Sequence, residues 1–149
     1  MGAIGSNLKP SKTSRIDIFA EYVHHTDGPR RIDIMICWDK SNIHKSENPV
    51  WHSGVVIEAK INSQLQNEQL LAYEKITPSK IEQAEFHFLC HSLKNTDILN
   101  LRDAKEYWNI SFWHKLLRSW EIHLTKPDNK NIDDADFRLF RATLWEQVT

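Results

Sequence analysis

Two runs of β-forming residues near the start of the chain predict a hairpin. Residues 15–25 and 30–38 are rich in Ile, Val and aromatic side chains, and a Thr-Asp-Gly-Pro turn signal at 26–29 lies between them. After the polar stretch 39–53, the apolar run 55–61 predicts a third strand. The first half of the chain is therefore expected to form a three-stranded unit.

The next segments predict a helix followed by a further strand. Ser63 followed by Gln66 has the pattern of a capping box, and apolar residues beyond it predict a helix over about 64–75. The run Glu-Phe-His-Phe-Leu-Cys-His at 85–91 predicts a fourth strand, entered by a crossover from the helix and parallel to its neighbour. The order β-β-β-α-β is typical of an α/β fold with a central mixed sheet.

The remaining segments predict two covering helices and two irregular stretches. Apolar residues at helical spacing, among them Trp113, predict a helix over 111–124 and a last helix from about residue 133, both covering the sheet. Residues 92–97 are polar and predict a loop, and residues 1–14 lack apolar periodicity and predict an irregular arm. We expect a single domain over 1–149, flanked by helices.

Composition limits the classes of function. The chain of 149 residues has ordinary hydrophobic and charged fractions, 40% and 26%, which indicates a folded globular protein. Its formal charge of −1 means that any contact with a polyanion must be local. Cys37 and Cys90 lie in apolar runs, which suits buried thiols, and we find no secretory signal and no long apolar segment. These features predict a cytoplasmic protein without a membrane partner.

The third predicted strand carries a carboxylate and an ammonium group on one face. Side chains alternate along a strand, so Glu58 and Lys60 share a face while Ala59 points away. If the run around Asp33 is the antiparallel neighbour, its carboxylate reaches the same patch. Two carboxylates with a lysine can hold Mg²⁺ and activate water for hydrolysis.

These residues resemble the signature of the PD-(D/E)XK nuclease superfamily. The matching segments are Arg-Ile-Asp-Ile at 31–34, Ile-Glu-Ala-Lys-Ile at 57–61 and the Gln-rich stretch that follows. Gln69 and Tyr73 resemble the Gln-x-x-x-Tyr motif of RecB-like exonucleases, directly after the lysine strand. The segment 108–112 is similar to one that precedes a late helix in standalone bacterial and phage-associated members.

The resemblance implies a fold, a reaction and roles for individual residues. The fold would be restriction-endonuclease-like, but without the family's usual first helix, because only the arm precedes the first strand. Asp33, Glu58 and the backbone carbonyl of Ala59 would hold Mg²⁺ or Mn²⁺, and Lys60 would orient or deprotonate the attacking water. Gln69 and Tyr73 would support the site or touch the nucleic acid. The substrate would be DNA rather than RNA, in phage defence or DNA processing.

Several alternatives stay open from the sequence. Glu58 and Lys60 could form only a structural ion pair, Tyr73 could belong to the core, and Gln69 could be solvated. The domain could be a non-catalytic module for nucleic-acid recognition or assembly. The missing first helix predicts a homodimer or a subunit of a larger complex, because an uncovered sheet face leaves an apolar patch. A rearranged C-terminal helix is the alternative cover for that face.

Two residues outside the motif are further candidates. Glu21 would be a third metal ligand if a three-residue turn sets it opposite Asp33, whereas a two-residue turn sets Tyr22 there. Trp51, in the predicted long loop, is a candidate for stacking on a nucleobase.

Overall fold

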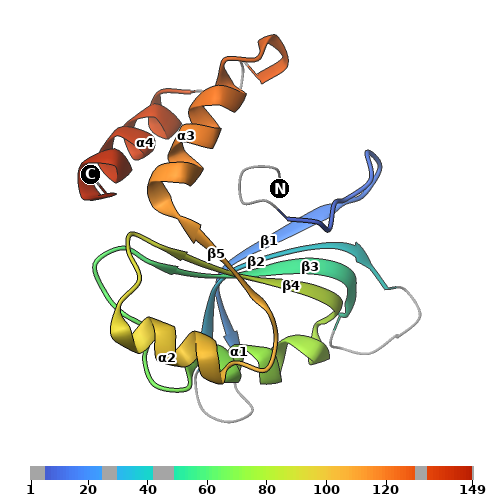
Figure 1. Ribbon diagram of the computed structural model, residues 1–149. Coiled ribbons are helices and arrows are strands. Elements are labelled where there is room, and N and C mark those ends of the chain that lie inside the picture. The colour runs from blue at the N-terminus through green and yellow to red at the C-terminus, as the bar shows by residue number, and fades with distance from the viewer. Residues whose placement is uncertain (1–5, 25–29, 42–48, 130–133, 149) are drawn as a thin grey trace.

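The computed structural model is an α/β fold with a mixed sheet between two layers of helices (Figure 1). It describes residues 6–24, 30–41, 49–129 and 134–148. The five strands lie in the sheet in their order along the chain. They are β1 (Ile16–His24), β2 (Arg30–Lys40), β3 (Trp51–Lys60), β4 (Ile81–Cys90) and β5 (Trp108–Phe112).

Strand directions divide the sheet into two halves. β1, β2 and β3 pair antiparallel, as the predicted hairpin and third strand require. β4 is parallel to β3, and β5 is parallel to β4. These parallel pairs need crossovers, which α1 (Gln69–Ile76) and α2 (Asn95–Asp103) provide. The expected β-β-β-α-β core is confirmed, and the structure extends it by one helix and one strand.

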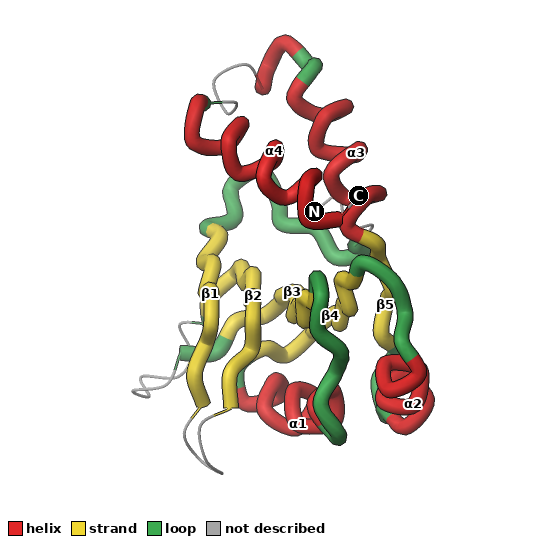
Figure 2. The backbone as a smooth tube through the Cα atoms, turned by 90° about the vertical axis from the view of Figure 1, so that its left-hand side faces the viewer, coloured by secondary structure: helices red, strands yellow, loops and turns green. Residues whose placement is uncertain are grey.

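Each face of the sheet has its own core. Figure 2 shows α1 and α2 on one side, and α3 (Trp113–Leu124) with α4 (Ala135–Val148) on the other. Strand alternation sends Met35 and Val56 toward α1, while Trp38 and Val55 point toward α3. The late helices thus cover the sheet as the sequence predicts. No described helix has the length and apolar character needed to cross a membrane.

The first helix begins later than its sequence pattern suggests. The expected start near Gln64 and the capping box at Ser63 are wrong, because α1 starts only at Gln69. The preceding Glu68 adopts a left-handed backbone, with φ of 58°, and gives the helix no side-chain cap. Upstream, the N–H of Leu65 donates to the buried carboxylate of Asp97 at 2.8 Å. A tertiary bond therefore fixes this loop where the sequence predicts the first turn of the helix.

The segment after β4 also differs from its prediction. The expected loop at 92–97 is wrong in its second half, because α2 starts at Asn95 with Asp97 as its capping carboxylate. Two apolar residues of α2, Ile98 and Leu99, are exposed, so the helix lacks the buried stripe by which helices are recognised. The late helix begins at Trp113 rather than at residue 111, since β5 occupies the two residues before it.

Trp51 is not in a loop. β3 begins at Trp51, whose ring is buried, packs edge-on against Phe19 and donates from Nε1 to Asp17 at 2.9 Å. The expected role of Trp51 in base stacking is therefore wrong, because neither face of a buried ring is open to a nucleobase.

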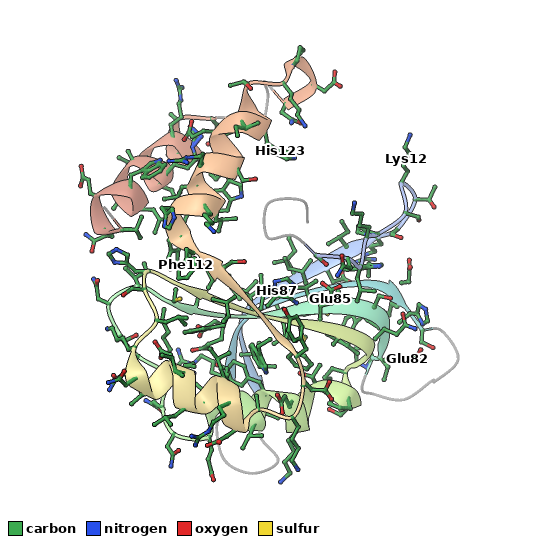
Figure 3. All side chains as sticks on the ribbon, in the orientation of Figure 1. Lys12, Glu82, Glu85, His87, Phe112 and His123 are labelled. Carbon is green, nitrogen blue, oxygen red and sulfur yellow. The ribbon has the colours of Figure 1, made fainter. Side chains whose placement is uncertain are left out.

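The arm before β1 is anchored to the sheet by one carboxylate. Glu85 of β4 accepts hydrogen bonds from the Ser6 hydroxyl at 2.7 Å and from the N–H groups of Asn7 and Leu8 at 3.0 and 3.1 Å. The neighbouring His87 contacts the same carboxylate through Nε2 at 3.2 Å (Figure 3). The described part of the arm has no helix or strand, as the sequence predicts.

Candidate active site

The three predicted charged residues converge on one face of the sheet. The hydrogen-bonded ladder between β2 and β3 ends at the pair Ile34 and Ile57. The next residue along each strand beyond that pair is Asp33 on β2 and Glu58 on β3, so the two lie side by side. There the Asp33 carboxylate accepts a hydrogen bond from the Ala59 N–H at 3.0 Å, in place of a further backbone contact. A side-chain oxygen thus enters the gap where the two strands separate.

Glu58 is the centre of the cluster. Its side chain is 0% exposed, and its Oε1 accepts hydrogen bonds from Lys60 Nζ and Gln69 Nε2, both at 2.7 Å. Its second oxygen, Oε2, is buried and has no hydrogen-bond partner among the residues that the structure describes. A buried polar atom without a partner costs free energy, so this oxygen is a candidate to hold a ligand.

Burial shifts the ionisation of this carboxyl group. Loss of solvent raises the pKa of Glu58 to about 7, and the nearby charge of Asp33 adds to the increase. The hydrogen bond from Lys60 opposes the shift without cancelling it. A cation beside Oε2 would favour the charged form and lower this pKa, because opposite charges stabilise ionisation.

Helix α1 supports the cluster through two residues one turn apart. Gln69 Nε2, which donates to Glu58, also lies 3.3 Å from the Tyr73 hydroxyl. That hydroxyl donates to the backbone carbonyl of Arg31 on β2. Burial raises the pKa of Tyr73, so its hydroxyl keeps its proton and remains a donor. Gln69 is therefore not solvated, and Tyr73 belongs both to the core and to the site.

One contact of the site escaped sequence reasoning. The indole of Trp113, the first residue of α3, donates from Nε1 to the backbone carbonyl of Lys60 at 2.9 Å. Its position in an apolar stripe indicated only core packing. A buried Trp needs a partner for its N–H, and this requirement was the available signal.

The oxygen donors suit a hard divalent cation. Asp33 and Glu58 supply carboxylates, and the peptide between Glu58 and Lys60 supplies the carbonyl of Ala59, the donor types that Mg²⁺ and Mn²⁺ accept. The unpartnered Glu58 Oε2 fits such a group. Over the described part of the chain, which leaves out the Glu21 side chain, no three His, Cys, Asp or Glu side chains cluster as a ready-made site.

The third acidic candidate remains a prediction. Tyr22 pairs with Ile32 and Ala20 with Ile34, so Tyr22 does not lie opposite Asp33 and the two-residue turn register is excluded. The side chain of Glu21 lies outside the described residues, as do the turn residues 25–29.

Comparison with known proteins agrees with this geometry. A family model described as the PD-(D/E)XK nuclease superfamily matches residues 4–135. Searches of curated proteins and of solved structures found no match. The family match covers most of the chain and includes both motif strands and the Gln-x-x-x-Tyr helix. The chain therefore belongs to the PD-(D/E)XK nuclease superfamily.

Proposed function

We propose that this protein is a nuclease that uses Mg²⁺ or Mn²⁺ to hydrolyse phosphodiester bonds of DNA. The observation that carries the proposal is the buried Glu58 Oε2, which has no hydrogen-bond partner in the described parts of the chain, while Oε1 of the same carboxylate bonds Lys60 and the charge of Asp33 lies nearby. A buried carboxylate in this state is costly unless a ligand completes it. Membership of a nuclease superfamily supports a phosphodiester as the substrate.

Asp33, Glu58 and the Ala59 carbonyl would hold the cation. When bound, the cation polarises the phosphoryl oxygens and makes water more acidic. Lys60 orients the attacking water and stabilises the negative charge that develops on the phosphate. Gln69 holds Glu58 at Oε1, which leaves Oε2 directed away from the Lys60 contact. Tyr73 ties α1 to β2 through the Arg31 carbonyl, and Gln69 ties the same helix to Glu58 on β3, so that Asp33 and Glu58 keep their separation.

We further propose that a second copy of the chain covers one edge of the sheet. Ile16 and Ile18 of the edge strand β1 are 47% and 67% exposed, and their pairing with Trp38 and Ile36 puts them on the face that carries α3 and α4. Pairing two copies would bring two active sites onto one duplex. Light scattering at micromolar concentration should give twice the mass of 17.5 kDa. A stable monomer that binds no hydrophobic dye would refute the dimer.

The biological setting follows from the family resemblance. We propose DNA rather than RNA as the substrate, a role in phage defence or DNA processing, and action in the cytoplasm. Both cysteines, Cys37 and Cys90, are buried and unpaired, which suits a reducing compartment.

A cleavage assay tests the proposed activity. Linear, circular and single-stranded DNA and an RNA strand are incubated with the protein in EDTA, Mg²⁺ or Mn²⁺. We expect cleavage of DNA with either metal and none in EDTA. Absence of metal-dependent cleavage on every substrate would refute the nuclease and favour a non-catalytic recognition or assembly module.

A further inference from the structure

The junction between β5 and α3 lies on the same face as the active-site lysine. In the parallel register Lys60 pairs with Cys90, and Cys90 pairs with Phe112. Residues paired across strands share a face, so Lys60 and Phe112 project from the same side, two strands apart. Two strand spacings correspond to about 10 Å between their Cα atoms. Phe112, marked at this junction in Figure 3, also packs partly against the core beneath α1.

A hydrogen bond fixes the position of this junction. Trp113 follows Phe112 directly, and its buried indole donates to the Lys60 carbonyl at 2.9 Å. The bond crosses from the start of α3 to the end of β3, passing over the strand between them. The residues on either side of Trp113 are therefore held at a set distance from the Lys60 backbone.

Those flanking residues form an aromatic pair with a cation beside it. The Phe112 and His114 rings are nearly parallel, with 19° between their planes and 5.9 Å between their centroids. The Lys115 ammonium lies 5.6 Å from the centroid of the Phe112 ring. His114 and Lys115 are both exposed, so their outer surfaces are open to a ligand. Stacked rings with an adjacent cation are what proteins offer to single-stranded nucleic acids.

We propose that Phe112, His114 and Lys115 form a platform that holds an unpaired nucleotide of the DNA strand being cut. A nucleobase stacks on the His114 ring, and Lys115 contacts the adjoining phosphate. The distance of about 10 Å between the Cα atoms of Lys60 and Phe112 is one that roughly three stacked nucleotides span. The identity of this ligand rests on the proposed nuclease function.

The platform implies a preference for single strands or frayed ends. In an intact duplex both faces of each internal base are covered by its neighbours, so no base is available to a side-chain ring. A single strand offers free base faces at no unpairing cost. We therefore expect these residues to determine which DNA structure is bound, whereas Glu58 and Lys60 act on the phosphate.

A binding experiment separates the platform from catalysis. Fluorescence anisotropy is measured for the wild-type protein in EDTA, with an oligothymidylate, an abasic strand and a blunt duplex of equal length. We expect the oligothymidylate to bind about tenfold more tightly than the other two probes. The variant Phe112→Leu/His114→Ala should lose this preference. Tyr107→Ala, which removes an exposed ring outside the platform, should keep it.

The outcomes are distinct. Equal affinity of the wild type for all three probes, or an unchanged preference in the double variant, would overturn the platform. If the double variant does not fold, His114→Ala alone decides, because the ring of His114 is exposed. A protein that shows the preference but cuts no DNA would refute the proposed nuclease and not the platform. A metal-dependent nuclease without the preference would do the reverse.

Discussion

Two neighbouring strands carry the same acid-x-base spacing, but the carboxylates of the two pairs differ in how fully the fold satisfies their hydrogen bonds. β3 carries Glu58 and Lys60, and β4 carries Glu85 and His87. The parallel register pairs Glu58 with Phe88 and Glu85 with Val55, so the two pairs face opposite sides of the sheet. Only the pair on β3 is a candidate active site, although the spacing along the strand is the same.

The carboxylate of the pair on β4 is completed by the protein itself, whereas the buried Nδ1 of His87 has no hydrogen-bond partner among the described residues. Burial alone would raise the pKa of Glu85, but hydrogen bonds from Ser6, His87 and the N–H groups of Leu8 and Asn7 outweigh it, and the pKa is lowered. Burial lowers the pKa of His87 more than Glu85 raises it. This carboxylate is charged, fully bonded and structural.

The pair on β3 is left incomplete. Glu58 is more deeply buried than Glu85, yet one of its oxygens lacks a partner within the described ranges, and its pKa is raised to about 7. A carboxylate that the fold satisfies anchors a segment, and one that the fold leaves unsatisfied is a candidate ligand site. The difference lies in the partners, which the spacing along the strand does not reveal.

The largest expected effect is on cleavage. Lys60→Ala should lower the cleavage rate by about 10²–10⁴-fold, because the ammonium acts on charge that develops in the transition state. The melting temperature should change little near pH 6, since Glu58 can take up a proton when its partner is removed. Lys126→Ala, at an exposed position two residues beyond the end of α3, is the control. Wild-type rates in the Lys60 variant would rule out its role.

The next largest effect should be on metal affinity, which should depend on Glu58 and not on Glu85. Calorimetry with Mn²⁺ should show affinity reduced by about 100-fold or more in Asp33→Ala and Glu58→Gln, because each removes a ligand. Glu85→Gln should bind as the wild type does. Affinity of the wild type should also rise as pH increases through about 7, the pKa of Glu58, because the bound form is the carboxylate. An equal loss of Mn²⁺ affinity in Glu85→Gln would show that Glu58 and Glu85 do not differ in metal binding.

In the absence of metal, the substitutions Glu58→Gln and Glu85→Gln should change the free energy of unfolding in opposite directions. The raised pKa of Glu58 means that the folded state holds its proton more tightly, so the stability it contributes is lost as pH rises from 4.5 through about 7. In EDTA at pH 8, the free energy of unfolding of Glu58→Gln should therefore be higher than that of the wild type, by about 1–3 kcal/mol. Glu85, with a lowered pKa, contributes stability above pH 4.5. The free energy of unfolding of Glu85→Gln should therefore be lower than that of the wild type, by about 1–3 kcal/mol. Urea denaturation at pH 5 and pH 8 measures both.

The smallest effects should come from the supporting helix. Gln69→Ala removes one donor to Glu58 and should lower cleavage by about tenfold, while Tyr73→Phe should cost about 1 kcal/mol of stability. Ala72→Ser, between them on α1, is the control for changes to the helix itself. A larger effect in the control than in either variant would show that α1 supports only the fold.

The strands that bear the motif could be predicted because their pattern is local. Alternation along 30–38 and 55–61 sets which side chains share a face, and the hairpin sets the antiparallel order that brings Asp33 to Glu58. β5 is only five residues long and α2 exposes apolar residues, so neither has the periodicity that marks an element. Local pattern fails where tertiary contacts define the structure.

The partners of buried polar groups could not be predicted for the same reason. Ser6 lies 79 residues from Glu85, and Trp113 lies 53 residues from Lys60. No spacing rule connects residues so distant along the chain. The sequence shows which groups need partners, and only the fold shows which groups receive them.

One experiment tests the central claim most directly. Cleavage of single-stranded and duplex DNA is followed in Mg²⁺ and in EDTA for the wild type, Glu58→Gln and Glu85→Gln. We expect metal-dependent cleavage by the wild type and by Glu85→Gln, and none by Glu58→Gln. Cleavage by Glu58→Gln at the wild-type rate, or no metal-dependent cleavage by the wild type, would contradict it.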